Sequence, residues 1–284
     1  EASDCCTRPH PPRTNYSVIR YLKPVAFPTV KQGERYPNWK HSDIVSQRFL
    51  SGLQHQISVK ALLADSNSSS HRARLLAVAA PKAGAWLTAI PGGLHRMSSM
   101  HFSTAICYRL GATTYPFNVN TQQRCRHCGA VEEEAGFHAV SCSVKLKIAR
   151  HDDGKRTFAR WLRRCNVDAQ EESRFSSRNN SRPGDVTHFM NTGSHEQLDF
   201  VYSNPCTASM LPQAAQKKLH AAEMAARRKI HKYAEQFARA QADGHDTNFV
   251  PMSIETYGGW HEMALEHARK VVKQMAHNAG AITR

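Results

Sequence analysis

The spacing of hydrophobic residues predicts helices in the first part of the chain. Between residues 42 and 64, apolar side chains recur every three or four positions, which is the period of an amphipathic helix. Shorter helical patterns follow at 72–79 and 98–110, with a serine-rich loop at 66–70 before the first of them. Residues 1–42 are rich in Pro, Arg, Thr and Tyr and show no period, so they are expected to be a linker or the edge of an upstream domain.

Helical and strand patterns alternate in the second half. A basic amphipathic helix is predicted at 154–165, and two β-rich runs at 185–191 and 197–204 are joined by TGSHE, which is typical of a hairpin. The order continues with a long helix over 212–242, a strand over 249–256 and a last helix after Gly258-Gly259. Strands and helices interleaved in this way predict an α/β domain with a small mixed sheet flanked by helices.

The charge balance favours a polyanionic partner. The 284 residues include 38 Lys plus Arg against 23 Asp plus Glu, a net charge of +15. DNA, RNA or an anionic membrane would suit this excess, and a solvated basic surface without a specific partner is the alternative. No apolar run approaches the ~20 residues that span a bilayer, and no secretory signal is visible. An intracellular protein is therefore expected, and its start at Glu1 suggests a fragment of a longer one.

Four residues in RCRHCGAVEEEAGFHAVSC have the spacing of a zinc site: Cys125, Cys128, His138 and Cys142. Three thiolates and an imidazole are the ligands of a closed, tetrahedral zinc, which leaves no open position for catalysis. His127 lies between two ligands and is expected not to bind. Two roles stay open, a knuckle that binds nucleic acid and a zinc that only staples the chain, and a chance cluster of cysteines is the third possibility.

Two aspartates are candidate ligands for Mg²⁺. Asp185 opens the first strand of the predicted hairpin and Asp199 lies in the second. A hairpin can bring two such carboxylates to one end of a sheet, where they would bind Mg²⁺. A bound Mg²⁺ activates water and neutralises phosphate charge during hydrolysis. The alternative is a pair of surface aspartates at a turn and a strand edge.

The long helix contributes further candidates for the same site. Glu223 falls on its apolar stripe, where an acid needs a partner, and Lys229 and Lys232 lie beside and outside the stripe. A lysine near two aspartates could stabilise a pentavalent phosphate. Glu223 could instead form an i,i+4 ion pair with Arg227, and the basic run 227–229 could face a nucleic-acid backbone. Glu255 ends the last predicted strand, and a strand end at a glycine turn is favoured over a metal ligand.

The order of these motifs resembles a known family. GAWLTAIP, CRHC…H…C, RPGDV, LDF, AAEMAARRKIHKYAE and FVPMSIETYGGW, spread over roughly residues 43–280, resemble the C-terminal region of non-LTR retrotransposon proteins of the restriction-like-endonuclease type, including reverse-transcriptase-like tails of algae and protists. The resemblance implies a PD-(D/E)XK-like fold and Mg²⁺-dependent nicking of DNA beside an upstream reverse transcriptase. It makes Asp185 and Asp199 the metal ligands. The usual lysine position, two residues after the second acid, is Val201, so Lys229 or Lys232 would replace it.

These observations predict four segments: 1–42, a linker or fragment edge; 43–120, a helical region; 121–150, the CCHC zinc knuckle; and 151–284, the endonuclease-like domain. The leading hypothesis is a nuclear, Mg²⁺-dependent DNA endonuclease with a structural zinc, with RNA of the element as a further partner and no membrane. The alternatives are a catalytically inactive nucleic-acid-binding module and, less favoured, a zinc-stapled protein-interaction domain. The residues expected to contact nucleic acid are Arg124, Arg126, Lys155, Arg156, Arg182, Arg227 and Arg228.

Overall fold

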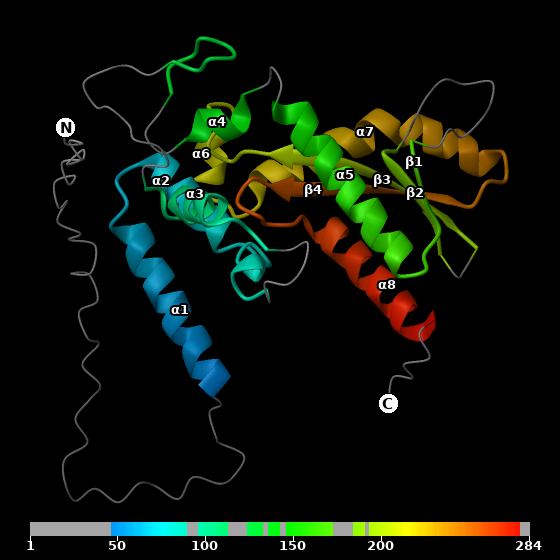
Figure 1. Cartoon of the computed structure of the whole chain (residues 1–284), viewed down its shortest axis with the longest axis horizontal. Coiled ribbons are helices and arrows are strands. Elements are labelled where there is room, and N and C mark those ends of the chain that lie inside the picture. Colours follow the sequence, from blue (N-terminus) through cyan, green and yellow to red (C-terminus); the bar gives the residue numbers. More distant parts are fainter. Residues whose placement is uncertain are drawn as a thin grey trace, which may run out of the picture. The chain divides into compact units, whose positions relative to one another are not determined.

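A four-stranded mixed sheet organises the C-terminal half of the protein in this computed structural model (Figure 1). Its strands β1 (Ala169–Glu171), β2 (Val186–Phe189), β3 (His195–Ser203) and β4 (Thr247–Glu255) lie side by side in that order. The first three strands are antiparallel and β4 is parallel to β3. A parallel pair requires a crossover connection, and helix α7 (His220–Ala242) provides it.

The structure describes residues 47–89, 96–112, 124–132, 136–142, 146–172, 184–190 and 193–278. The predicted linker 1–42 lies outside these ranges. Residues 53–284 form one compact unit. No helix within the described ranges combines the length and the apolar character that a membrane crossing requires.

Helices α5 (Leu146–Arg164) and α8 (Glu262–Asn278) cover one face of the sheet. Successive strand residues point to opposite faces, so Leu198 and Phe200 lie on the same side. They form the main core with Phe158 and Leu162 of α5 and Val271 of α8, all of them buried. The predicted amphipathic helix at 154–165 is therefore the C-terminal part of α5, which begins earlier, at residue 146.

Helix α7 covers the other face. The rings of Tyr233 and Phe237 pack on Phe249 of β4, with centroids 5.1 and 5.2 Å apart. Ser253 of β4 donates a hydrogen bond to the carbonyl of Ala222, 2.7 Å away. The odd-numbered residues of β3 and β4, including the candidate Asp199, consequently face α7.

The helical region before the cysteine cluster contains α1 (Gln47–Ala64), α2 (Ser69–Val78), the short 3₁₀ helix η3 (Ala85–Leu87) and α3 (Ser99–Leu110). It is joined to the sheet through Tyr108, which stacks on Tyr257 with ring centroids 4.5 Å apart. Its hydroxyl also lies 3.1 Å from that of Thr256. Arg109 donates to the carbonyls of Val78 and Ala83, so α3 is fixed to the end of α2 and the turn after it.

The predicted mixed α/β architecture is confirmed, and one predicted element is wrong. The helix expected over 212–242 consists of two helices, α6 (Leu211–Ala214) and α7. Leu219 precedes α7 in a left-handed conformation with φ 59°, which ends any continuous helix there. The buried carboxylate of Glu255 accepts a hydrogen bond from the Ala221 N–H, 3.2 Å away, and so caps the first turn of α7. The short elements β1 and α4 (Phe137–Ser141) were not predicted.

Candidate functional site

The predicted cysteine and histidine ligands converge in space. The ligand atoms of Cys125, Cys128, His138 and Cys142 all lie within 4.8 Å of one another. The two cysteine sulfurs of Cys125 and Cys142 are 3.7 Å apart, and Cys128 Sγ is 3.1 Å from His138 Nε2. Across the described ranges, this is the one group of three or more such side chains with that proximity. It could hold a metal ion such as zinc.

Local backbone geometry builds this cluster. Gly129 has φ +74° and donates to the carbonyl of Cys125 at 2.9 Å, which closes the turn that carries the first two cysteines. Helix α4 carries His138, and Cys142 follows its last turn. Backbone N–H groups of His127 and Cys128 point at the Cys125 sulfur and lower the pKa of its thiol to about 6, which favours the thiolate that binds metal. The imidazole of His127 is not part of the group.

Hydrogen bonds from Asn204 and Arg150 tie helix α4 of the cluster to the α/β domain. The side-chain amide of Asn204, just after β3, donates to the carbonyl of Phe137 at 3.2 Å. Arg150 of α5 donates to the carbonyl of Val140 at 2.6 Å. The cysteine cluster therefore braces the start of α5 against the end of β3.

The two predicted aspartates lie opposite each other on neighbouring segments. Val186 of β2 pairs with Leu198 of β3, so Asp185 falls opposite Asp199 in the same register. The Asp185 N–H donates to the Leu198 carbonyl at 2.7 Å, and Asp185 Oδ2 accepts the Phe200 N–H at 2.7 Å. Lys229 of α7 reaches across, with Nζ 2.6 Å from Asp199 Oδ2. Lys232 interacts electrostatically with both aspartates.

His151 belongs to this site although the sequence analysis did not single it out. Its Nε2 lies 3.0 Å from Asp185 Oδ2, and its Nδ1 lies 3.4 Å from Asp152 Oδ1. His151 precedes Phe158 by seven positions and Leu162 by eleven, which is the inward stripe of α5. This spacing could have identified His151 as a site candidate, because a polar residue on the inward stripe of a helix needs a buried partner.

The environments of the two aspartates differ. Burial raises the pKa of Asp185, but the His151 contact and the Phe200 N–H lower it by more, so its net pKa is below the ordinary value. Burial raises the pKa of Asp199, and the Lys229 contact offsets this only in part. The hydrogen bond to Asp185 raises the pKa of His151. Neighbouring carboxyl groups whose pKa values are pushed apart are typical of sites that bind cations or transfer protons.

A cationic pocket of about 360 Å³ is lined by His151 and Lys229, the residues that contact the two acids, and the acids themselves lie behind this lining. Strand β2 pairs with β3 only as far as Leu198, so the rest of that edge of β3 is left without a strand partner among the described residues. The pocket lies along this edge between α5 and α7. Its basic lining consists of Lys147, His151, Arg228, Lys229 and Lys232. Such a concentration of positive charge beside an edge strand suits a phosphate backbone.

Two predicted site residues take other roles. Glu223 lies 2.6 Å from Arg227 Nε and 3.0 Å from His261 Nε2, so it forms the i,i+4 ion pair and does not join the aspartates. Lys155 is only 5% exposed, and its ammonium lies 2.6 Å from Glu172 Oε1. The expectation that Lys155 contacts phosphate is therefore corrected, because its charge is already neutralised in the interior.

The other predicted contacts remain on the surface. The side chains of Arg124, Arg126, Arg156, Arg227 and Arg228 are exposed. Arg182 lies outside the described residues. Glu255 is 1% exposed at the first turn of α7, and burial raises the pKa of its carboxyl to about 7. Its role is to cap α7, in agreement with the strand-end interpretation.

No protein-family model matches the chain, and no curated protein matches its sequence.

Proposed function

We propose that this chain is the Mg²⁺-dependent DNA endonuclease portion of a retroelement protein, which nicks target DNA by hydrolysis of a phosphodiester. One observation carries the proposal. Asp185 and Asp199 lie opposite each other, and the residues that contact them, His151 and Lys229, line a cationic pocket. Two acids and a lysine beside a phosphate-binding pocket are the groups that such a hydrolysis needs.

The aspartates suit Mg²⁺. In proteins this ion is held by one or two carboxylates, with water and substrate phosphate completing its coordination. Oδ2 of each aspartate is engaged, Asp185 by His151 and the Phe200 N–H and Asp199 by Lys229. Asp199 Oδ2 is buried and has no hydrogen-bond partner among the described residues beyond this ion pair, so a cation that displaced Lys229 would find a carboxylate ligand there. When bound, Mg²⁺ would activate water and neutralise charge on the phosphate.

The other residues of the site bind and orient. His151 holds the Asp185 carboxylate in one orientation through its Nε2. Lys229 offsets the charge of buried Asp199 and presents an ammonium at the wall of the cationic pocket. Arg228, Lys232 and Lys147 line the same pocket and would bind phosphates that flank the cleaved bond.

The PD-(D/E)XK-like fold is part of the proposal. It is supported by a mixed sheet with helices on both faces, and by acids on two adjacent segments of that sheet. Val201 occupies the strand position usually held by lysine, and it lines the same pocket as Lys229. A lysine on α7 can therefore bring its ammonium to the region that a strand lysine would reach.

The four-ligand cluster is proposed to hold a structural zinc. Its ligand set is closed, and its hydrogen bonds to Asn204 and Arg150 lead to the two elements that form the cationic pocket. The proposal includes action on nuclear DNA, RNA of the element as a second ligand and a reverse transcriptase domain upstream.

A catalytically inactive nucleic-acid-binding module is the second candidate. The ion pair between Lys229 and Asp199 favours it, because a lysine on a carboxylate competes with a metal ion for that carboxylate.

Nicking of supercoiled plasmid tests the proposal. The wild-type protein with Mg²⁺ should convert supercoiled DNA to open circles, and Asp199→Ala should reduce the rate at least about a hundred-fold. Asp243→Ala is the matched control, since Asp243 is an exposed aspartate at the end of α7. Equal nicking by the wild type and Asp199→Ala would refute the site. DNA binding without any nicking would favour the inactive module.

A further inference from the structure

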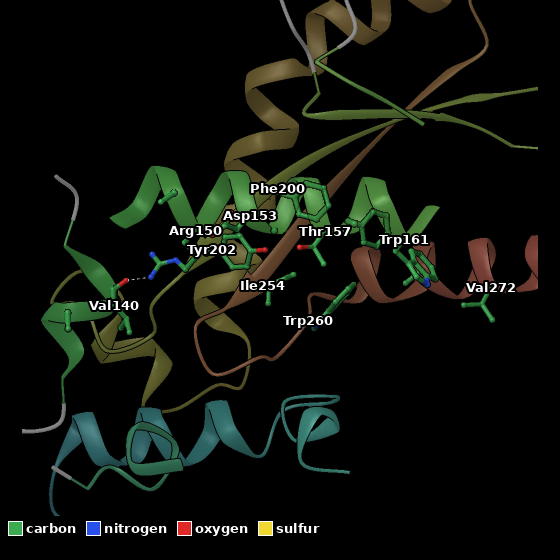
Figure 2. A pocket seen from close by; sticks show the side chains of 15 residues that line it. Val140, Arg150, Asp153, Thr157, Trp161, Phe200, Tyr202, Ile254, Trp260 and Val272 are labelled. Atoms are coloured by element: carbon green, nitrogen blue, oxygen red, sulfur yellow. Dashed lines mark hydrogen bonds between the residues drawn. The ribbon is translucent and has the colours of Figure 1, made fainter. Parts of the chain in front are cut away.

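A second, largely apolar hollow lies between α5 and α8, on the sheet face opposite to α7 (Figure 2). Its volume is about 940 Å³, near the upper end of the range for ligand pockets. Figure 2 shows Trp161, Phe200, Tyr202 and Trp260 around it, contributed by α5, β3 and the segment before α8. Both tryptophans are only partly buried, so their rings are accessible to a ligand.

This aromatic groove adjoins the cationic pocket. Phe200 and Tyr202 belong to the lining of both hollows. A chain with charges in the cationic pocket could therefore place an adjoining flat, apolar group in the groove. A strand of nucleic acid combines such groups, because it carries charged phosphates on its backbone and flat bases beside them.

The polar groups of the groove match the edge of a base. Arg150 and Asp153, one turn apart on α5, supply a donor and an acceptor at its wall. Arg150 uses one terminal nitrogen to bind Val140, while its Nε is buried and has no hydrogen-bond partner among the described residues. The Arg150 side chain as a whole is only half-buried and Asp153 is exposed, so both can contact a ligand in the groove.

We propose that the aromatic groove binds an unpaired base of the DNA strand whose phosphates occupy the cationic pocket. Bases stack on aromatic side chains, and their edges carry the acceptors and donors that Arg150 and Asp153 can recognise. A base inside a duplex is covered by its neighbours, so the preferred substrate is single-stranded or locally melted DNA. The inference rests on the proposed function, because the phosphate pocket is the one beside Asp185 and Asp199.

An apolar peptide is the competing occupant. It would cover the aromatic rings, but it would give no reason for a cationic pocket to adjoin the groove.

Strands with and without bases separate these possibilities. Tryptophan fluorescence of the full chain is titrated, without added Mg²⁺, with a short oligothymidylate and with an abasic strand of the same length. Oligothymidylate should quench the fluorescence and bind about ten-fold more tightly than the abasic strand, because only it can stack. The corresponding duplex should bind without base-dependent quenching. Equal affinity for the two single strands, or quenching by an amphipathic peptide and not by oligothymidylate, would overturn the inference.

Variants locate the effect. Trp260→Leu should abolish the preference for the strand with bases, and Trp86→Phe, outside the groove, should keep it. Thr157→Phe fills the groove from an exposed position of α5 and should have the same effect as Trp260→Leu if the groove is the site. A preference unchanged in both groove variants would also overturn the inference.

The result is independent of cleavage. Asp199→Asn should retain the preference for bases even where it does not nick. Base-dependent binding by a protein that never nicks DNA would support the base-binding groove and refute the proposed nuclease function. Nicking without base-dependent binding would support the nuclease function and refute the base-binding groove.

Discussion

Lys229 Nζ lies 2.6 Å from Asp199 Oδ2, a contact that joins the middle of α7 to the middle of β3. Burial raises the pKa of this aspartate, and the lysine compensates in part. The same ammonium also interacts electrostatically with Asp185, so one helix residue adjusts both candidate metal ligands. A lysine held in this way can orient a phosphate without being a strand residue.

Removal of this lysine is the first test. Lys229→Met should lower the nicking rate by about a hundred-fold, because a preorganised charge at the phosphate is lost. Arg239→Ala is the control on the same helix, since Arg239 pairs with exposed Glu235 at the surface and such pairs contribute about 0.3–0.5 kcal/mol. Plasmid nicking measures both. If Lys229→Met nicks DNA at the wild-type rate and Lys232→Met does not nick, the lysine that stabilises the phosphate is Lys232.

Metal content tests the cysteine cluster. The purified wild-type protein should contain about one equivalent of zinc by elemental analysis, and Cys128→Ser should lose it because three ligands hold the ion less tightly than four. Cys107→Ser is the matched control, since Cys107 is a free cysteine on α3 outside the cluster. A full equivalent of zinc in Cys128→Ser would contradict the ligand assignment.

The stability of the fold should depend on pH through Glu255. Burial raises the pKa of its carboxyl to about 7 from 4.5. Between these values the native state keeps a proton that the unfolded state has released, so the contribution of Glu255 to the free energy of unfolding declines as pH rises from about 4.5 to about 7. The buried His188 and His267, whose pKa values burial lowers to about 4 and about 3, act in the opposite sense, so the contribution of Glu255 is the difference between the wild type and a variant without this carboxyl. The change is on the order of 3 kcal/mol. Glu255→Gln should remove this decline, as measured by urea unfolding at about pH 5 and about pH 8.

The control for this pH effect is Glu235→Gln. Glu235 is an exposed glutamate on α7, and its replacement should leave the decline in place. If Glu255→Gln and the wild type lose the same stability between the two pH values, burial of Glu255 is not the cause.

A glycine inside α5 provides a packing test. A Cβ at Gly154 would lie 1.8 Å from the hydroxyl oxygen of Tyr202. Alanine is the better helix former by about 1 kcal/mol, yet overpacking costs about 1–3 kcal/mol, so Gly154→Ala should lower the free energy of unfolding. Tyr202→Phe should relieve part of this loss, because the next ring atom, Cζ, is 2.8 Å from the same position. Additive effects in a double-mutant cycle would contradict the contact.

The sequence by itself predicted the elements with a clear hydrophobic period and the motif with closely spaced ligands. The mixed sheet and the hairpin of β2 and β3 followed from alternation, and the candidate metal ligands from cysteine spacing, because these depend on a few neighbouring residues. The hairpin also implied that Asp185 and Asp199 come close together. β1 and α4 are too short to show a period and went unpredicted.

The tertiary structure decided which side chains share an environment. Glu223 and Lys229 lie on the same helix, but Lys229 contacts Asp199 while Glu223 pairs with Arg227 and His261. Lys155 and His151 both lie on α5, yet the lysine is neutralised by Glu172 and the histidine meets Asp185. The sequence by itself supplies the candidate acidic and basic residues. Their partners are distant in sequence, so only the packing of the helices on the sheet decides which of these residues pair.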